Sequence, residues 1–443
     1  MKLLFLLAHM LNEPSFYSTY KMLIKNQWKP YQELVSEQEK ALRKMIAYAY
    51  QNVPYYHDLF KRLQLKPEDI KTIKDLERLP ILTKEIIKKN WDKFIPKNID
   101  KIRYSIRSTG GSTGAPFKYR LDRYNHMFGV AINYRGWSYG GYNLDDKVVV
   151  LGGASVGVSK KPKVMRKIDA IVRNRRYLSS FDMDTSSMKS YVETINRFKP
   201  KYMYGYASSF YFFANWLEQN KLEVFSPKAI FTTAEKLFPH MRKKIETVFN
   251  TQVYDTYGLN DGCVSAFECS EHTGLHIDTE RAVMEIVDDD GHQMQEGKGK
   301  IIATSLYNFS LPFIRYDTGD IGHITGDKCG CGREYRLLKE VVGRQQEILQ
   351  TPDGKYIHGE FFTHIFWEIE HVKEFQVIQE TLDTIVIKIV PEEGFDEKSL
   401  EIIRKMIGER SRNWNIEFKL VDTIERTNAG KYKFVINKMG LGK

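Results

Sequence analysis

The sequence predicts an α/β fold with a large N-terminal domain and a small α+β domain at its C-terminal end. Three observations support this prediction. The chain has 443 residues, which is too long for a single hydrophobic core. Strand-like and helix-like patterns alternate through its middle. Beyond about residue 345 the pattern changes to strands around one helix. We therefore expect a large domain at residues 1–343 and a small domain at residues 344–443.

The first helix is expected over residues 38–53, where apolar residues from Leu42 to Ala49 recur at helical spacing. Pro54 ends this pattern, because proline cannot continue the backbone hydrogen bonds of a helix. The apolar run 148–151 precedes two glycines and is typical of a buried strand that ends in a loop.

The middle of the chain repeats a strand–helix unit. Strands are expected at residues 202–204, 229–232 and 253–256, with helices at 208–220 and 239–249. This alternation predicts a largely parallel sheet, in which ligands bind at the carboxyl ends of the strands. We therefore expect a functional site in the loops at 205–208, 233–236 and 257–261.

The C-terminal domain shows a different order of elements. Strands are expected at 374–378 and 384–390 around a turn at 381–383, followed by a helix at 397–407 and a strand at 416–421. The domain boundary is expected near Gly343-Arg344.

The net charge of +11 favours anionic partners such as nucleotides, coenzyme A or anionic lipid. The sequence contains no zinc-finger or RRM signature, so nucleic acid is not expected as a partner. Four cysteines do not make a disulfide framework, which favours a reducing cytoplasm.

The apolar N-terminal run from Met1 to Ala8 is short for a signal peptide, and far shorter than the roughly 18 residues of a membrane span. We interpret it as a docking element or the start of an amphipathic helix. The resulting hypothesis is a cytoplasmic protein that can associate with the inner membrane surface.

The strongest local motif is Ser108-Thr109-Gly110-Gly111-Ser112-Thr113-Gly114-Ala115-Pro116. Glycines allow backbone N–H groups to turn inward around an anion, and the hydroxyls add further donors. The motif is not a Walker A loop, because no Gly-Lys-[Ser/Thr] follows. The composition alone leaves two interpretations open, a phosphate-binding loop or a flexible polar loop.

Further motifs follow in a fixed order along the chain: Tyr257-Gly258-Leu259-Asn260-Asp261, Arg315-Tyr316-Asp317-Thr318-Gly319-Asp320, Gly343-Arg344 and Arg426-Thr427-Asn428-Ala429-Gly430-Lys431. With these motifs the sequence resembles the adenylate-forming superfamily over nearly its whole length. It looks most like the phenylacetate–coenzyme A ligase family, in particular the branch linked to capsular polysaccharide biosynthesis. The resemblance implies an AMP-binding N-terminal domain with mixed sheets and a mobile C-terminal lid.

The resemblance also implies a role for each motif around ATP. The residues concerned are Ser108 to Gly114 at the β- and γ-phosphates, Ala234 and Glu235 beside the adenine, Asp255, Tyr257 and Gly258 at the adenine and α-phosphate, Asp320 at the ribose hydroxyls, and Arg344 at the hinge. Lys431 is the implied catalytic cation from the small domain, and Asp261 is the implied magnesium ligand.

The sequence departs from the family pattern at two of these positions. Asp261 stands where the family usually has glutamate, and Gln346 replaces the usual acidic residue of the hinge. Both departures leave open an altered second half-reaction or a weakened enzyme.

A zinc site is a separate prediction. Cys269, His276, Cys329 and Cys331 supply four ligands of the kind that structural zinc takes in a tetrahedron. The resembling family shows a comparable arrangement. His272 and Cys263 are the alternative ligands, and free cysteines beside surface histidines are the alternative interpretation.

The acyl pocket is expected at Tyr204, Gly205, Tyr206 and Ala207, with Tyr134 and Trp137 as further candidates. The leading hypothesis is activation of a small carboxylic acid by ATP, followed by transfer to coenzyme A. One alternative transfers the acyl group to an amine or hydroxyl of a sugar-linked polysaccharide precursor. A second alternative is a nucleotide-binding scaffold that has lost catalysis.

Overall fold

The computed structural model describes residues 2–109, 117–152, 168, 170–179, 183, 185–344, 348–352, 356–358, 361–362, 365–366, 369–409, 411, 413–425 and 433–439. The described residues up to Val342 form one compact unit, and those from Gly343 onward form a second unit. The strand that contains this boundary runs without interruption to Arg344.

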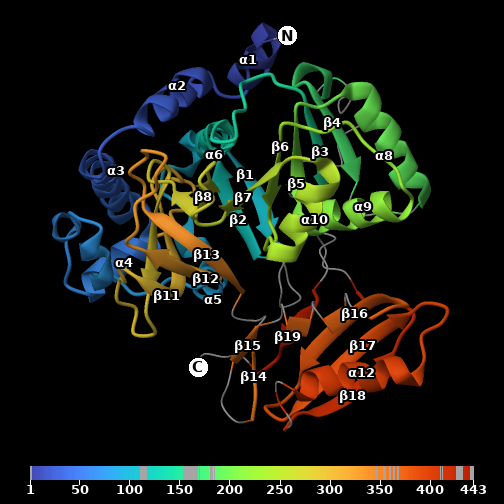
Figure 1. Cartoon of the computed structure of the whole chain (residues 1–443). Helices are drawn as coiled ribbons and strands as arrows, with labels where there is room; N and C mark the ends of the chain where they lie inside the picture. The colour runs from blue at the N-terminus through green and yellow to red at the C-terminus, as the bar shows by residue number, and fades with distance from the viewer. Residues whose placement is uncertain are drawn as a thin grey trace. The chain divides into compact units, whose positions relative to one another are not determined.

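The helices of the larger unit precede or alternate with its strands (Figure 1). They are α1 (Lys2–Met10), α2 (Phe16–Asn26), α3 (Tyr31–Asn52), α4 (Pro54–Arg62), α5 (Lys84–Lys89), α6 (Arg123–Ser138), α8 (Thr185–Phe198), α9 (Ala207–Gln219) and α10 (Pro239–Phe249). Short 3-10 helices lie at Pro67–Asp69, Lys74–Arg78, Trp91–Phe94 and Ile99–Lys101.

The strands of the larger unit are β1 (Tyr104–Thr109), β2 (Phe117–Asp122), β3 (Val148–Gly152), β4 (Arg175–Ser179), β5 (Tyr202–Tyr206), β6 (Ala229–Thr233), β7 (Gln252–Gly258), β8 (Ser265–Glu268), β9 (Leu275–Ile277), β10 (Ala282–Val287), β11 (Gly297–Ser305), β12 (Tyr316–Thr325) and β13 (Leu337–Arg344). β1 and β2 form an antiparallel pair, and the others follow the order β10-β11-β12-β13-β9-β8-β7-β6-β5-β3-β4.

This long sheet is mixed, as expected. The strands β4, β3, β5, β6 and β7 pair in parallel, whereas β7, β8 and β9 pair antiparallel. The parallel half is the part that the strand–helix alternation predicts. Figure 1 shows α9 and α10 beside this half.

The expected strands and helices of the larger unit are confirmed, with ends that differ by a few residues. α3 begins at Tyr31, about two turns before the expected start at residue 38. One expected loop is wrong: β5 continues to Tyr206 and α9 begins at Ala207, so no loop separates them. β7 likewise extends through Gly258, into the loop expected at 257–261.

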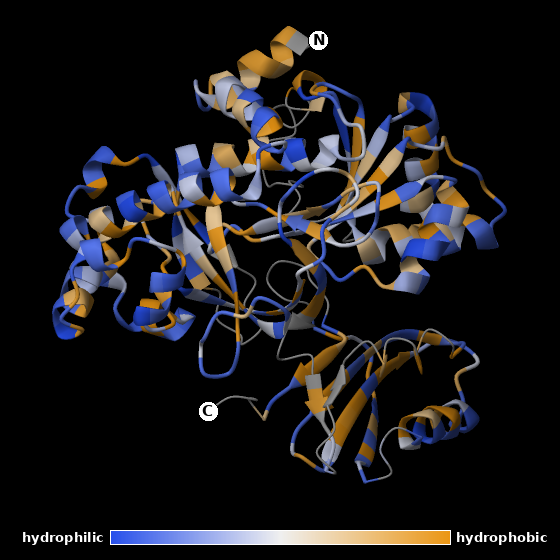
Figure 2. Ribbon diagram, turned by 60° about the vertical axis from the view of Figure 1, so that its left-hand side comes forward, coloured by the Kyte–Doolittle hydropathy of each residue, from blue (hydrophilic) through white to orange (hydrophobic). Residues whose placement is uncertain are grey.

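The core of the larger unit is apolar and contains buried ion pairs, among them Arg135–Asp278 and Arg315–Glu285. Arg135 on α6 is 1% exposed, and its guanidinium donates to the Asp278 carboxylate at 2.9 Å and to the Tyr335 hydroxyl at 2.6 Å. Because an unpaired buried charge is costly, these partners fix α6 against the loops that flank β9 and β13. Figure 2 shows, in orange, the apolar residues along the strands that form this core.

The smaller unit has its own sheet and core. Its elements are β14 (Ile348–Gln350), β15 (Tyr356–His358), β16 (Val372–Gln379), β17 (Thr384–Pro391), α12 (Glu397–Gly408), β18 (Asn415–Leu420) and β19 (Val435–Asn437). The strand order is β18-β17-β16-β19, with β14 paired to β15. The side chain of Asp396 caps α12 by accepting from the backbone of Ser399. The α+β prediction for this region is confirmed.

Gly205 shows how tightly the parallel strands pack. A Cβ atom at this position would lie 1.7 Å from the carbonyl oxygen of Leu151, its partner on β3. Because β5 is paired with β3 on one side and β6 on the other, the backbone at Gly205 cannot shift to accommodate this atom. The structure therefore gives Gly205 a packing role, independent of any contact with substrate.

We expect Gly205→Ala to lower the free energy of unfolding of the larger unit by about 2 kcal/mol or more, as overpacking does in rigid cores. Urea denaturation followed by tryptophan fluorescence measures this loss. Gly408→Ala is the control, because a Cβ atom there meets nothing within 4 Å. Equal stability of Gly205→Ala and the wild type would contradict the packing role.

Candidate active site

Several of the predicted nucleotide and acyl residues lie at one edge of the sheet. β5, β6 and β7 are parallel neighbours, with Tyr206 opposite Thr233 and Thr232 opposite Asp255. The residues that follow these positions therefore meet at the carboxyl ends of three adjacent strands. This is the edge at which open α/β sheets bind ligands.

Glu235 is held against the start of α9. Ala234 has a φ of +66°, a left-handed conformation that turns the chain sharply after β6. The carboxylate of Glu235 then accepts from the backbone N–H of Ser208 at 3.1 Å. A carboxylate is favourable there, because the first turn of a helix carries partial positive charge.

Asp255 is surrounded by donors and by a second acid. Its carboxylate accepts from the Thr232 hydroxyl at 2.7 Å, and its backbone N–H donates to Glu268 at 2.7 Å. Burial and the charge of Glu268 raise the pKa of Asp255 to about 6. Glu268 is in turn paired with Arg242 at 2.8 Å. Sequence reasoning missed Glu268 and Arg242, because neither belongs to a motif.

Tyr257 and Asp320 come together from opposite parts of the sheet. The Tyr257 hydroxyl donates to Oδ2 of Asp320 at 2.9 Å, and the Asp320 side chain is buried on β12. Burial and the neighbouring carboxylate raise the pKa of Tyr257 well above its usual value, so its hydroxyl keeps its proton. The predicted ribose ligand thus lies next to a residue of the predicted adenine pocket.

Asp261 lies beside the base of the β1–β2 hairpin. Its buried carboxylate accepts from the Tyr316 hydroxyl at 3.0 Å. The ring of Tyr316 stacks on Phe117, the first residue of β2, with centroids 6.2 Å apart. Thr109 and Phe117 pair across this hairpin, and the predicted phosphate loop between them lies outside the described residues. Tyr316 was not predicted as a site residue, although it lies inside the motif that contains Asp320.

Several predicted residues lie outside the described part of the chain. They are Gly110, Gly111, Ser112, Thr113, Gly114, Gln346 and Lys431, together with the side chains of Ser108, Thr109 and Arg344. Their predicted roles remain predictions.

The expected acyl pocket residues lie at the carboxyl end of β5. The Tyr204 ring packs on Trp137 with centroids 4.7 Å apart, and Trp137 stacks on Phe231 at 5.5 Å. Tyr134 is 1% exposed and packs against Trp137 and Tyr142. Tyr134 and Trp137 therefore belong to the core beneath this edge.

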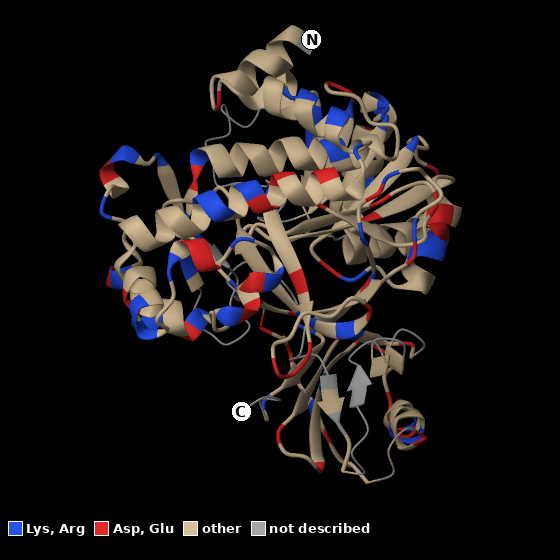
Figure 3. Cartoon of the chain, turned by 90° about the vertical axis from the view of Figure 1, so that its left-hand side faces the viewer, with Lys and Arg blue, Asp and Glu red and all other residues tan. Residues whose placement is uncertain are grey.

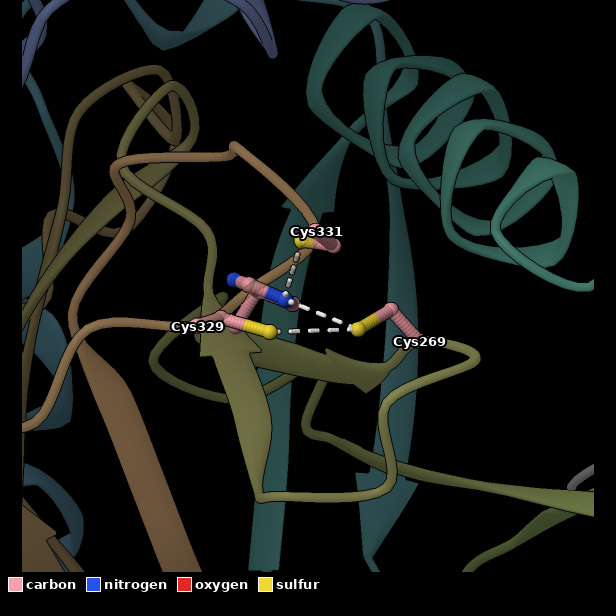
Figure 4. A group of neighbouring side chains, drawn as sticks. Cys269, Cys329 and Cys331 are labelled. Atoms are coloured by element: carbon pink, nitrogen blue, oxygen red, sulfur yellow. Dashed lines mark hydrogen bonds between the residues drawn. The ribbon is translucent and has the colours of Figure 1, made fainter.

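The four predicted zinc ligands form a compact group (Figure 4). The Sγ atoms of Cys269 and Cys329 are 3.5 Å apart. Nε2 of His276 lies 3.3 Å from Sγ of Cys269 and 3.4 Å from Sγ of Cys331. A tetrahedral zinc ion would set these separations at about 3.8 Å between sulfurs and about 3.6 Å from nitrogen to sulfur. The group therefore fits zinc with little movement.

The two alternative zinc ligands, Cys263 and His272, contact other residues. Cys263 accepts from the side-chain amide of Asn125 at 3.0 Å. His272 is paired with Glu268 at 3.1 Å. The structure therefore favours the first set of four, which joins the turn between β8 and β9 to the segment between β12 and β13.

The raised pKa of Asp255 predicts a pH effect on stability. The folded state keeps a proton on Asp255 between pH 3.8 and about 6, where the unfolded chain has lost it. The folded state therefore loses stability as pH rises through this window. We expect Asp255→Asn to gain thermal stability over the wild type as pH rises through it.

Melting temperatures of both proteins across this window measure the gain. Asp288→Asn is the control, because the backbone N–H of His292 lowers the pKa of that exposed carboxylate. A difference between Asp255→Asn and wild type that stays constant across the window would contradict the raised pKa.

Comparisons with known proteins show which proteins this chain resembles. Residues 349–438 match the family model described as the CapK C-terminal domain. Protein CapK of Staphylococcus aureus is 28% identical, over 92% of this chain and 90% of that protein. A phenylacetate-coenzyme A ligase of Thermus thermophilus is 24% identical, over 83% of each chain.

Solved structures show the same fold. A 2-hydroxyisobutyryl-CoA ligase in its postadenylation state, in complex with R3-HIB-AMP, superposes with a TM-score of 0.72 at 19% identity, covering 94% of this chain and 92% of that chain. The same ligase with 2-HIB-AMP and CoA gives a TM-score of 0.64, covering 93% and 91%. The chain is thus similar over most of its length to CapK and to phenylacetate-coenzyme A ligases, and its residues 349–438 match the CapK C-terminal domain.

Proposed function

We propose that this chain uses ATP to convert a carboxylic acid into an acyl-adenylate, releases pyrophosphate, and then transfers the acyl group to coenzyme A. The observation that carries the proposal is the gathering of Asp255, Tyr257, Asp261 and Asp320 around the carboxyl edge of the sheet. The names of the relatives, which include phenylacetate-coenzyme A ligases, support the same activity.

Different residues of the site contact different parts of ATP in this proposal. Asp320 binds the ribose hydroxyls, because a carboxylate accepts two hydrogen bonds at once. Tyr257 holds that carboxylate in place through its hydroxyl at 2.9 Å. The glycine- and hydroxyl-rich loop at 110–114 binds the β- and γ-phosphates.

The chemical step brings two anions together. An oxygen of the carboxylate attacks the α-phosphorus, and the bond from that phosphorus to the departing pyrophosphate breaks. Positive charge and alignment therefore provide most of the catalysis. In this proposal Lys431 supplies one cation. Asp261 offers the oxygen ligand that Mg²⁺ prefers, and magnesium when bound neutralises phosphate charge.

There is one alternative to coenzyme A as the acyl acceptor of the second step. Asp261 and Gln346 depart from the family pattern at the metal ligand and the hinge, so the step after adenylation is where this chain can differ. An amine or hydroxyl of a sugar-linked precursor is the alternative acceptor. A scaffold without catalysis is disfavoured, because Asp320, Tyr257 and Lys431 are all retained.

Pyrophosphate release across a panel of carboxylic acids tests the proposal. Purified chain, ATP and magnesium are incubated with each acid, and coenzyme A or hydroxylamine is added to separate the two steps. Thioester formation supports coenzyme A as acceptor. Adenylation with hydroxamate but without thioester supports the amine or hydroxyl acceptor. ATP binding without pyrophosphate from any acid favours the scaffold.

We expect Lys431→Ala to slow adenylation by two or more orders of magnitude (roughly 3 kcal/mol of barrier), because the lost cation acts on charge that develops in the transition state. The rate of acid-dependent pyrophosphate exchange measures this. Lys419→Ala on β18 is the matched control, since Lys419 is an exposed lysine of the same unit. Normal adenylation by Lys431→Ala would remove this lysine from the mechanism.

The cysteine and histidine group is proposed to hold a structural zinc ion. We expect Cys329→Ser to lose bound zinc, and chelation to lower the thermal stability of the wild type, because zinc bound only to the folded state adds about 3 kcal/mol at a hundredfold excess over its Kd. Atomic emission measures the zinc content. Cys263→Ser is the control, because Cys263 lies outside the group. Wild-type chain that contains no zinc after purification with zinc present would refute the site.

A further inference from the structure

The first helix has an apolar face that no described residue covers. Phe5 and His9 on its inner side are fully buried, and Nε2 of His9 accepts from the Tyr134 hydroxyl at 3.1 Å. The opposite side consists of exposed apolar residues, here called the leucine face: Leu3, Leu4, Leu7, Met10 and Leu11. Leu3 is 70% exposed and Leu11 is 82% exposed. Figure 2 shows this apolar helix next to the N-terminal label.

Such a helix is unusual on a surface. A helix that is apolar on all sides normally lies inside a protein or against a membrane. Contiguous exposed apolar side chains mark an interaction site far more often than scattered single ones do. The leucine face therefore requires a partner.

A basic cavity adjoins the end of this helix. Its volume is about 620 Å³, and its polar lining includes Asn12, Arg103, Arg107, Arg123, His126 and Arg173. No carboxylate is among the described residues that line it. We refer to it as the arginine cavity. Figure 3 marks the lysines and arginines of the chain in blue and shows α1 without an acidic residue.

Hydrogen bonds join α1 and the residue after it, Leu11, to the arginine cavity. Nη2 of Arg123 donates to the backbone carbonyl of Leu11 at 3.0 Å. Nη1 of Arg173 donates to Nε2 of His9 at 3.0 Å. Asn12, the residue after Leu11, lines the cavity itself. The apolar face thus ends at the edge of a positively charged cavity.

The charge in this cavity also affects its histidine. Burial, followed by the positive charges of Arg107, Arg281 and Arg173, lowers the pKa of His126 to about 4. His126 is therefore neutral at neutral pH, and an anion placed in the cavity would meet several guanidinium donors.

We propose that the leucine face and the arginine cavity together form a membrane-docking site. The cavity binds the phosphate of an anionic phospholipid head group, and the leucine face enters the boundary between head groups and acyl chains. Arginines pair with phosphate through parallel hydrogen bonds, and exposed apolar side chains of a helix are buried at the boundary between head groups and acyl chains.

The length of the helix agrees with this orientation. Nine residues extend about 14 Å along a helix, roughly half the thickness of the apolar part of a bilayer. Among the described residues, no helix has the length and hydrophobicity needed to cross a membrane. A soluble phosphate would explain the arginines but would leave the leucine face without a role.

Co-sedimentation of the full chain with lipid vesicles tests the proposal. We expect binding to vesicles of phosphatidylcholine mixed with phosphatidylglycerol, weak binding to phosphatidylcholine alone, and a loss of binding in high salt. Arg103→Gln combined with Arg123→Gln is expected to weaken binding by roughly fivefold for each arginine replaced. Leu4→Ser is expected to weaken it as well.

Matched controls separate this site from general charge and hydrophobicity. Lys61→Gln with Lys66→Gln makes the same change of charge on exposed residues near α4 and is expected to bind like the wild type. Leu420→Ser replaces a leucine that is 57% exposed, against 58% for Leu4, and is likewise expected to have no effect.

Three outcomes would overturn the proposal. The first is no binding of the wild type to anionic vesicles. The second is equal loss of binding in the site variants and the controls. The third is a double arginine variant that binds vesicles like the wild type but has a raised KM for coenzyme A. This result would assign the cavity to a soluble acceptor that carries phosphate. Pyrophosphate release without vesicles, measured in the same variants, keeps this test distinct from that of the catalytic proposal.

Discussion

The backbone pairing of β7 is the constraint on which the candidate site depends. Its first residues, up to Asp255, pair in parallel with β6, and its last three pair antiparallel with β8. One strand therefore joins the parallel half of the sheet to the antiparallel half. Because the change occurs between Asp255 and Thr256, these residues lie where parallel pairing gives way to antiparallel pairing. The next residue, Tyr257, donates to Asp320 on β12.

The site places acidic groups where a triphosphate is proposed to bind. Asp261 and Asp320 are 4% and 6% exposed, and burial together with Glu268 raises the pKa of Asp255 to about 6. Hydroxyl donors stabilise these carboxylates, since Tyr316, Tyr257 and Thr232 each donate to one of them. None of these donors carries positive charge. An anionic nucleotide in such a site requires cations from elsewhere, which agrees with the proposed roles of magnesium and of Lys431.

Local sequence patterns predicted most of the fold correctly. Strand–helix alternation over residues 202–256 predicted the parallel strands, because apolar runs of this length are favourable only when a sheet is covered on both faces. The same reasoning failed at residues 205–208, where β5 passes directly into α9. Turn residues do not mark this junction, because Gly205 is required by the close approach of β3 and not by a loop.

The sequence by itself determined which residues are candidates for the chemistry. The motifs around Asp255, Asp261 and Asp320, and the four possible zinc ligands, were evident from residue type and order. Only the tertiary structure decided their partners. Tyr316 beside Asp261, Glu268 beside Asp255, and His276 in preference to His272 all depend on contacts between distant strands. Spacing along the chain encodes local geometry, whereas contacts of this kind depend on strand order and register, which result from packing the whole core.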